Sequence, residues 1–293
     1  METAQPIPVF FAAEMIADAA SYSPSAGKPG PVVARFESLR LPVRIERPTP
    51  VTEADLARAH DPAYVRGVLS RIRPNGFGNR SAAVAASLPW TSGALLSAAR
   101  AALESRRVAC APCSGFHHAG WDHGAGFCTF NGLMVTACAL RAEGRARRVG
   151  ILDCDYHYGD GTDDILRALE AHPWIRHFTA GARHQTPAQA PAFFDELPRA
   201  LTAMSDCDVI LYQAGADPHI NDPLGGFLTT EELAHRDAIV FREARRMGIP
   251  LAWNLAGGYQ RDERGGIEPV LQIHANTMRA CAEAWGLIGS DGK

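Results

Sequence analysis

Four short apolar runs, each followed closely by polar residues, constrain this chain more than any other feature. Gly and Pro bound the runs, and stretches with helical character separate them, which is typical of buried strands in an α/β fold. We therefore expect a central, mainly parallel sheet flanked by helices. The runs are 107–112, followed by His117 and His118; 149–152, followed by 153–162; 209–213, followed by 214–217; and 249–255, followed by 256–259.

Length and composition are compatible with one folded unit. The chain has 293 residues, of which 46% are hydrophobic, and this is enough for a single large core. We therefore expect one domain that spans residues 1–293. The formal net charge of −3 provides no basic field, so we expect no nucleic-acid partner.

The sequence also bears on the compartment. No apolar run approaches the roughly 20 residues that a membrane span requires, so we expect no membrane partner. The N-terminus lacks the basic start and apolar stretch of a signal peptide, and we expect the seven cysteines to be reduced in a cytoplasmic protein. Cys110 and Cys113 have CxxC spacing without a second pair. We interpret them as packing residues, with a redox pair as the alternative.

Local patterns predict further elements around these four runs. Helix start signals and apolar periodicity indicate helices, and clusters of Gly, Pro, Ser and Asn indicate loops. We expect strands at 7–11 and 43–46, helices at 31–39, 91–105, 131–143, 162–171 and 231–247, a helix start at 52–55, and loops at 21–30, 73–79 and 185–191.

Polar residues at the carboxyl ends of the strands predict a metal site. In an open parallel sheet the functional crevice lies at these ends. Residues two apart on a strand point to the same face, so Asp155 and His157 can bind one ion together. Asp217 after the third run supplies a third ligand and leaves positions open, which is the pattern of a catalytic site. We expect Zn²⁺, with Fe²⁺ or Mn²⁺ as alternatives for this oxygen-rich set.

Two adjacent histidines suit proton transfer beside such an ion. One of His117 and His118 can take a proton from water while the other stabilises developing charge. Each needs a carboxylate behind it, and Asp153 and Asp160 are suitably placed. Tyr259 follows two glycines and could donate to an oxyanion, although taken alone it is better interpreted as an ordinary loop aromatic.

Several of these segments together resemble the histone deacetylase family, which includes bacterial acetylpolyamine amidohydrolases and belongs to the arginase–deacetylase superfamily. The resemblance runs in order from about Asp61 to Tyr259. It implies a single catalytic domain with a three-layer α/β fold, and hydrolysis of acetyl-amine amides. The segments are Gly-Phe-His-His-Ala at 115–119, Gly-Phe-Cys-Thr-Phe-Asn at 126–131, Asp-x-Asp-x-His-x-Gly-x-Gly-Thr at 153–162, 217–226 with Asp-Pro-Leu-Gly-Gly at its end, and Gly-Gly-Tyr at 257–259.

The resemblance also implies individual roles. Asp155, His157 and Asp217 would bind zinc. His118 would act as the general base and acid, with His117 as its electrostatic partner. Tyr259 would polarise the carbonyl of the substrate. Phe127 would form a wall of the substrate channel, and Gly126 would offer its backbone carbonyl oxygen nearby.

The chain departs from the family pattern in places. The usual His-Pro-Glu loop is absent from the N-terminal third, Gly132 stands where a second Asn is usual, and Tyr158 stands where His is frequent. The family commonly holds K⁺ behind the metal, on backbone carbonyls and a downstream Ser. Here Thr179-Ala180-Gly181 replaces the usual Ser-Leu/Ile-His, which alters that potassium site.

Two other functions compete with an amidohydrolase. An arginase-like ureohydrolase would use two Mn²⁺ ions and an Asp-x-His-x-Asp motif, but Gly159 stands where its last Asp would be and His219 follows Asp217 by two residues. A catalytically silent acyl-amine-binding protein would have lost a ligand or the tyrosine. For the amidohydrolase, acyl-lysine in a protein, an acetylpolyamine and another small acylated amine all fit the chemistry. The sequence does not indicate an oligomeric state.

Overall fold

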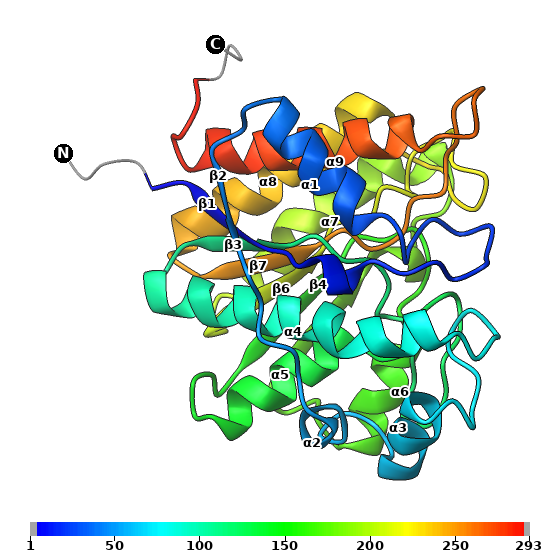
Figure 1. Cartoon of the computed structure of the whole chain (residues 1–293). Helices are drawn as coiled ribbons and strands as arrows, with labels where there is room; N and C mark the ends of the chain where they lie inside the picture. Colours follow the sequence, from blue (N-terminus) through cyan, green and yellow to red (C-terminus); the bar gives the residue numbers. More distant parts are fainter. Residues whose placement is uncertain (1–4, 290–293) are drawn as a thin grey trace.

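A seven-stranded parallel sheet forms the centre of the computed structural model, which describes residues 5–289 (Figure 1). The strand order is β2-β1-β3-β7-β6-β4-β5, and every neighbouring pair is parallel. The fold class is therefore as predicted. The strands are β1 (Ile7–Phe10), β2 (Val43–Glu46), β3 (Val108–Ala111), β4 (Val149–Asp153), β5 (Ile175–Thr179), β6 (Val209–Gln213) and β7 (Leu251–Asn254).

The central strands are buried on both faces, which explains why they are continuous apolar runs. Every residue of β3, β4, β6 and β7 is buried, whereas the edge strands β2 and β5 are partly exposed. Successive residues contact opposite cores: Val209 and Leu211 of β6 contribute to one, and Ile210 and Tyr212 to the other. The sheet thus separates two hydrophobic layers.

Helices cover both faces of the sheet, and together they make three layers (Figure 1). The layer below the sheet in Figure 1 contains α4 and α5, with α2, α3 and α6 beside them, and the layer above contains the other four helices. Their bounds are α1 (Pro29–Ser38), α2 (Glu53–Leu56), α3 (Pro62–Leu69), α4 (Ala82–Ser105), α5 (Gly132–Ala142), α6 (Asp160–Ala168), α7 (Ala190–Thr202), α8 (Thr230–Met247) and α9 (Glu268–Ala284), with short 3-10 turns at Ala13–Met15, Ala180–Ala182 and Pro187–Gln189.

Several element boundaries differ from the predicted ones. The helix expected from residue 91 begins at Ala82, because the Ser81 hydroxyl accepts the Val84 amide at 3.3 Å and the helix continues through Pro89. The predicted loop at 185–191 is wrong at its end, where α7 already begins at Ala190. β5, α3, α7 and α9 were not predicted. β5 carries Arg and His at a sheet edge, and this weakens its strand pattern.

Two expectations about the chain as a whole can be compared with the structure. α4 is apolar and long enough to cross a membrane, but most of its apolar stretch is buried and it packs against α5, β3 and β7. Its composition is explained by this place in the core.

The seven cysteines are all free, and Cys110 and Cys113 are fully buried, as packing residues should be. Residues 1–4, part of the N-terminus that we compared with a signal peptide, lie outside the described residues.

Gly93 in the middle of α4 provides a test of this packing. A Cβ atom there would lie 2.2 Å from the Thr49 carbonyl oxygen, a backbone atom. Replacing an interior helix glycine by alanine ordinarily stabilises by up to about 1 kcal/mol. We expect Gly93→Ala instead to lower the free energy of unfolding in urea by about 1–3 kcal/mol, since the backbone must move. The exposed Ala86→Gly on the same helix should cost only about 1 kcal/mol. A Gly93→Ala protein at least as stable as the wild type would contradict this packing.

Candidate active site

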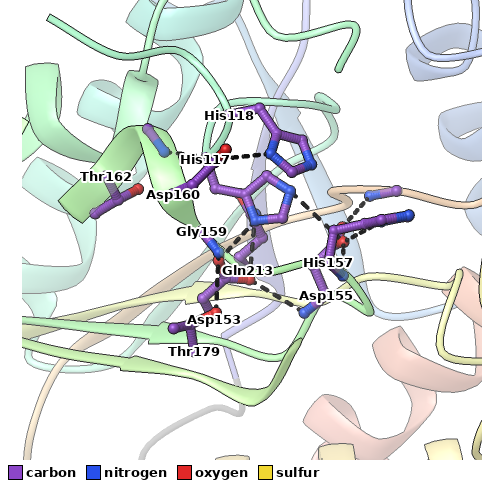
Figure 2. Close-up of polar contacts among 12 residues, drawn as sticks. His117, His118, Asp153, Asp155, His157, Gly159, Asp160, Thr162, Thr179 and Gln213 are labelled. Atoms are coloured by element: carbon purple, nitrogen blue, oxygen red, sulfur yellow. Dashed lines mark hydrogen bonds and ion pairs between the residues drawn. The ribbon is translucent and has the colours of Figure 1, made fainter. Parts of the chain in front are cut away.

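The candidate site lies where the carboxyl ends of the central strands meet. The strands end in register, with Asp153 of β4 opposite Gln213 of β6 and Gln213 opposite Asn254 of β7. The segments that follow these ends therefore emerge side by side. They carry residues 155–157, 217 and 257–259, and the segment after β3 brings His117 and His118 to the same place (Figure 2).

The three predicted metal ligands come together. Ligand atoms of Asp155, His157 and Asp217 all lie within 4.8 Å of one another, and both carboxylates are fully buried. The His157 Nδ1 atom is 3.2 Å from Asp155 Oδ1 and 3.1 Å from Asp217 Oδ2. Within residues 5–289 this is the one group of three such side chains. The arrangement could hold one divalent cation.

The electrostatics of this group fit a cation. Burial and the neighbouring Asp155 carboxylate raise the pKa of Asp217 to about 7. Burial alone would lower the pKa of His157, but the two carboxylates outweigh it and raise this pKa to about 11. Two carboxylates at such close range in a buried place oppose each other's ionisation unless positive charge lies between them. A protonated His157 or a bound divalent ion could supply that charge, and the Asp–His–Asp donor set fits such an ion.

Backbone groups fix the carboxylates. The Gly257 amide donates to Asp155 Oδ2 at 2.8 Å, and the Tyr156 amide donates to Asp217 Oδ1 at 3.2 Å. A Cβ atom at position 257 would lie 2.1 Å from Asp217 Oδ2, so this close approach requires glycine. The glycines after β7 thus have a packing role as well as leading to Tyr259.

The two adjacent histidines each pair with the predicted carboxylate. His117 Nδ1 lies 2.7 Å from Asp153 Oδ2, and His118 Nδ1 lies 2.7 Å from Asp160 Oδ1 (Figure 2). The rings are close, with centroids 4.1 Å apart. A Cβ atom at Gly126 would lie 2.4 Å from His118 Cδ2, so glycine allows the loop to pass against this ring.

The surroundings of the two imidazoles differ. Burial opposes the charge of His117, but Asp153 and Asp155 outweigh it and raise its pKa to about 9. Burial and the neighbouring His117 instead lower the pKa of His118. One ring therefore favours the imidazolium form and the other the neutral, basic form. Such a pair can combine fixed positive charge with proton transfer.

Tyr259 and Phe127 lie together beside this centre. Their ring centroids are 5.7 Å apart, and the Tyr259 amide donates to Asp222 Oδ2 at 2.7 Å. Burial and the site carboxylates raise the pKa of Tyr259, so its hydroxyl keeps its proton and can act as a donor. The half-exposed Tyr22 stacks on Tyr259 and meets Phe127 edge-on, both with centroids at 6.2 Å. These rings form an aromatic wall next to the histidines.

Several residues of the site were missed by sequence reasoning. Lys28, in a segment predicted to be a loop, is fully buried, and its Nζ donates to the carbonyl oxygens of Ala256 at 2.8 Å and Gly257 at 3.2 Å. Gln213, named only as part of a strand, donates to Asp153 Oδ1 at 3.2 Å. Lys28 is one of only two lysines in a chain rich in arginine, and this was the signal available in the sequence.

The departures from the family pattern have local explanations. A Cβ atom at Gly132 would lie 2.5 Å from the Phe116 ring, so a second Asn could not fit there without a shift. The Tyr158 hydroxyl donates to Asp163 and the ring is partly exposed. Thr179 Oγ1, which stands at the position of the usual Ser, accepts the Gly159 amide at 3.1 Å.

Comparison with known proteins agrees with the sequence motifs. The family model described as "Histone deacetylase domain" matches residues 32–172. The chain is 26% identical to an uncharacterized protein of Picosynechococcus sp. over 83% of this chain and 87% of that protein. It is 30% identical to histone deacetylase 2 of Arabidopsis thaliana and 29% identical to acetylpolyamine amidohydrolase 1 of Pseudomonas aeruginosa. These two alignments cover 50% and 49% of this chain, and less than half of each of those proteins, 43% and 48%.

Solved structures agree at the level of the fold. The HDA15 HD domain superposes with a TM-score of 0.76 at 19% identity, covering 98% of this chain and 91% of that one. An acetylpolyamine aminohydrolase from Burkholderia pseudomallei superposes with a TM-score of 0.69 at 20% identity, covering 96% of this chain and 98% of that one. The predicted relationship to the histone deacetylase family is confirmed. Asp217 and Tyr259 lie outside the matched residues 32–172, so their place in the site comes from the motifs and the geometry.

Proposed function

We propose that this protein is a metal-dependent amidohydrolase that removes an acetyl or other short acyl group from an amine. One observation carries the proposal: the buried group of Asp155, His157 and Asp217 lies beside two histidines that are each paired with a carboxylate. The match to the histone deacetylase family supports this class of reaction. The whole chain, residues 1–293, would form one catalytic domain.

A single divalent ion would be held by Asp155, His157 and Asp217. We propose Zn²⁺, with Fe²⁺ or Mn²⁺ as alternatives, because nitrogen and carboxylate ligands accept each of them. When bound, the ion would act as a Lewis acid toward the amide carbonyl and make water a stronger nucleophile. The protein supplies the rest of the chemistry.

His118 would move the protons. Because its Nδ1 atom is held by Asp160, its Nε2 atom is the free basic position, and its partly exposed ring lies 5.7 Å from the His157 ring. It would take a proton from the attacking water and then deliver one to the leaving amine. His117, held by Asp153 and buried, would remain charged and stabilise the negative charge that develops.

Tyr259 would assist at the carbonyl oxygen. Its ring contacts the rings of Phe127 and Tyr22, and its amide donates to Asp222, so its position does not depend on substrate. Its hydroxyl would donate to the oxygen as negative charge forms there. Phe127 would form a wall of the channel for a linear acyl-amine, with Gly126 next to it.

The other two functions are less well supported. The described residues contain one three-ligand group rather than the two-ion set of an arginase-like enzyme. His219 contacts Thr230 at 2.9 Å and Gln260 rather than the metal ligands. A silent binding protein would not be expected to keep both His–Asp pairs and Tyr259. We therefore propose acyl-lysine in a protein or an acylated small amine, such as an acetylpolyamine, as substrate.

The ligand assignment can be tested with Asp217→Asn. The substitution keeps the shape of the side chain but removes the charge that would bind the ion, and a three-ligand site has no ligand to spare. We expect less than a tenth of the wild-type metal content after dialysis, and no measurable turnover. Asp206→Asn, at an exposed ion pair with Arg148, should change neither quantity. Full metal content and full activity in Asp217→Asn would refute the assignment.

Proton transfer can be tested with His118→Ala. We expect kcat for an acetyl-lysine peptide or an acetylpolyamine to fall by about 10²–10⁴, the usual contribution of a general acid–base group. Metal content and the thermal unfolding midpoint should stay near wild-type values. The exposed His172→Ala is the matched control and should retain full kcat. A near-normal kcat in His118→Ala would place the base elsewhere.

The role of the tyrosine can be tested with Tyr259→Phe, which removes only the hydroxyl. Loss of one oxyanion donor costs about 10²–10³ in kcat. KM should change little because the interaction forms only in the transition state. A hydroxamate that chelates the metal should still bind. Tyr64→Phe removes another buried phenol hydroxyl, bonded to the Thr129 carbonyl, and should leave kcat unchanged. Wild-type turnover by Tyr259→Phe would reduce Tyr259 to a packing residue.

A further inference from the structure

α8 places a buried arginine behind the two segments that carry the site carboxylates. Arg236 is completely buried, and its Nη1 atom donates to two backbone carbonyl oxygens: Cys154 at 3.1 Å and Gly215 at 2.7 Å. Cys154 immediately precedes Asp155, and Gly215 lies two residues before Asp217. One guanidinium nitrogen thus joins the ends of β4 and β6 at the point where the candidate ligands begin.

The contact with Cys154 controls the orientation of one peptide. A peptide unit is planar, so holding the Cys154 carbonyl oxygen also fixes the direction of the Asp155 N–H in the same unit. That N–H donates to Asp153 Oδ1 at 3.1 Å, and Asp153 is the carboxylate that pairs with His117. Arg236 therefore orients the peptide of the candidate ligand Asp155 and, through that peptide, the Asp153 carboxylate that pairs with His117.

The contact with Gly215 acts on the other side of the site. Its carbonyl belongs to the same peptide unit as the Ala216 N–H, which donates to the Gly257 carbonyl oxygen at 3.0 Å. The Gly257 amide in turn donates to Asp155 Oδ2. A Cβ atom at position 215 would lie 2.9 Å from the Asp155 Cα atom, so the two segments pass each other closely here.

The charge of Arg236 is balanced on the side away from the site. Its Nε and Nη2 atoms each lie 2.9 Å from Asp237 Oδ1, the Tyr212 hydroxyl donates to the same carboxylate, and Thr277 Oγ1 donates to Asp237 Oδ2 at 2.5 Å. A buried ion pair is seldom more stabilising than apolar side chains of the same volume. Fold stability alone is therefore a weak explanation for this pair, whereas its contacts with the two carbonyls are specific.

We infer that Arg236 is a positioning residue that sets the geometry of the metal site by holding the Cys154 and Gly215 carbonyl groups at a fixed separation. This inference rests on the proposed function, since it takes the group of Asp155, His157 and Asp217 as the metal site. Arg236 makes no hydrogen bond with any of these three side chains. Its effect passes through the backbone.

The experiment compares metal affinity and metal geometry in three variants of the full chain. Arg236→Lys keeps the charge, but a shorter point charge cannot pair with Asp237 and hold both carbonyls together. Arg236→Met with Asp237→Leu removes the pair without leaving a lone buried charge. Thr277→Val is the matched control, because it removes a buried hydrogen bond to the same Asp237 and leaves the carbonyl contacts intact. Each protein is titrated with Zn²⁺ against a chelator, and the absorption spectrum of its Co²⁺ form is recorded.

We expect Kd for Zn²⁺ to rise 10–100-fold in Arg236→Lys and further in the double variant. Loss of a group that orients metal ligands through hydrogen bonds typically weakens metal binding by this factor. The Co²⁺ spectrum should change in both, and neither the affinity nor the spectrum should change in Thr277→Val. Wild-type affinity and spectrum in a folded Arg236→Lys or double variant, even with a lower melting temperature, would overturn the inference. If the wild type binds no stoichiometric Zn²⁺ or Co²⁺, the proposed function itself fails and the inference with it.

Discussion

The close approach of two buried carboxylates, Asp155 and Asp217, is the constraint on which the rest of this site depends. A parallel sheet brings the ends of β4 and β6 side by side, and any acidic residues placed there must share one small volume. Burial and mutual repulsion raise the free energy of that arrangement. It persists because backbone amides and an imidazole approach both carboxylates, and because a cation can be accommodated between them.

Positive groups from distant parts of the chain surround this concentrated negative charge. Lys28, immediately before α1, donates to the carbonyls of Ala256 and Gly257. Burial lowers its pKa to about 8, although the charges of Asp217 and Asp155 partly offset that effect. Arg236 on α8 holds the carbonyls that precede the ligands. Lys28 and Arg236 donate to these backbone carbonyl oxygens and not to the carboxylates of Asp155 and Asp217, whereas the charge of Arg236 is paired with Asp237.

The strand-end residues could be predicted from sequence because their position follows from local pattern. Asp155 and His157 come together as predicted, but the premise that both lie on a strand is wrong, because β4 ends at Asp153 and they lie in the bend that follows it. A parallel sheet carries Asp217 to them. β5, α7 and α9 escaped prediction because charged residues and internal prolines weaken their patterns, and packing against the sheet decides them instead. Lys28 could not be placed because its burial arises only when α1 folds against the β7 turn, which lies 228 residues away. Local composition there predicts a loop.

The residues proposed to carry out the chemistry and the residues proposed to select the substrate also differ in how the fold positions them. Asp153 ends β4 and Asp160 begins α6, and the candidate metal ligands and the two histidines lie in the segments that follow the strand ends. The aromatic wall is built differently: Tyr22 and Phe127 come from loops, and a positive φ of 65° at Phe127 shows that its loop holds an uncommon conformation to present the ring. Arg261 secures the Tyr22 carbonyl at 2.8 Å, so the N-terminal loop is tied to the segment after Tyr259. Because loops can change while the strand ends stay fixed, the proposed reaction would depend on the residues that follow the strand ends, and the choice of substrate would depend on these loops.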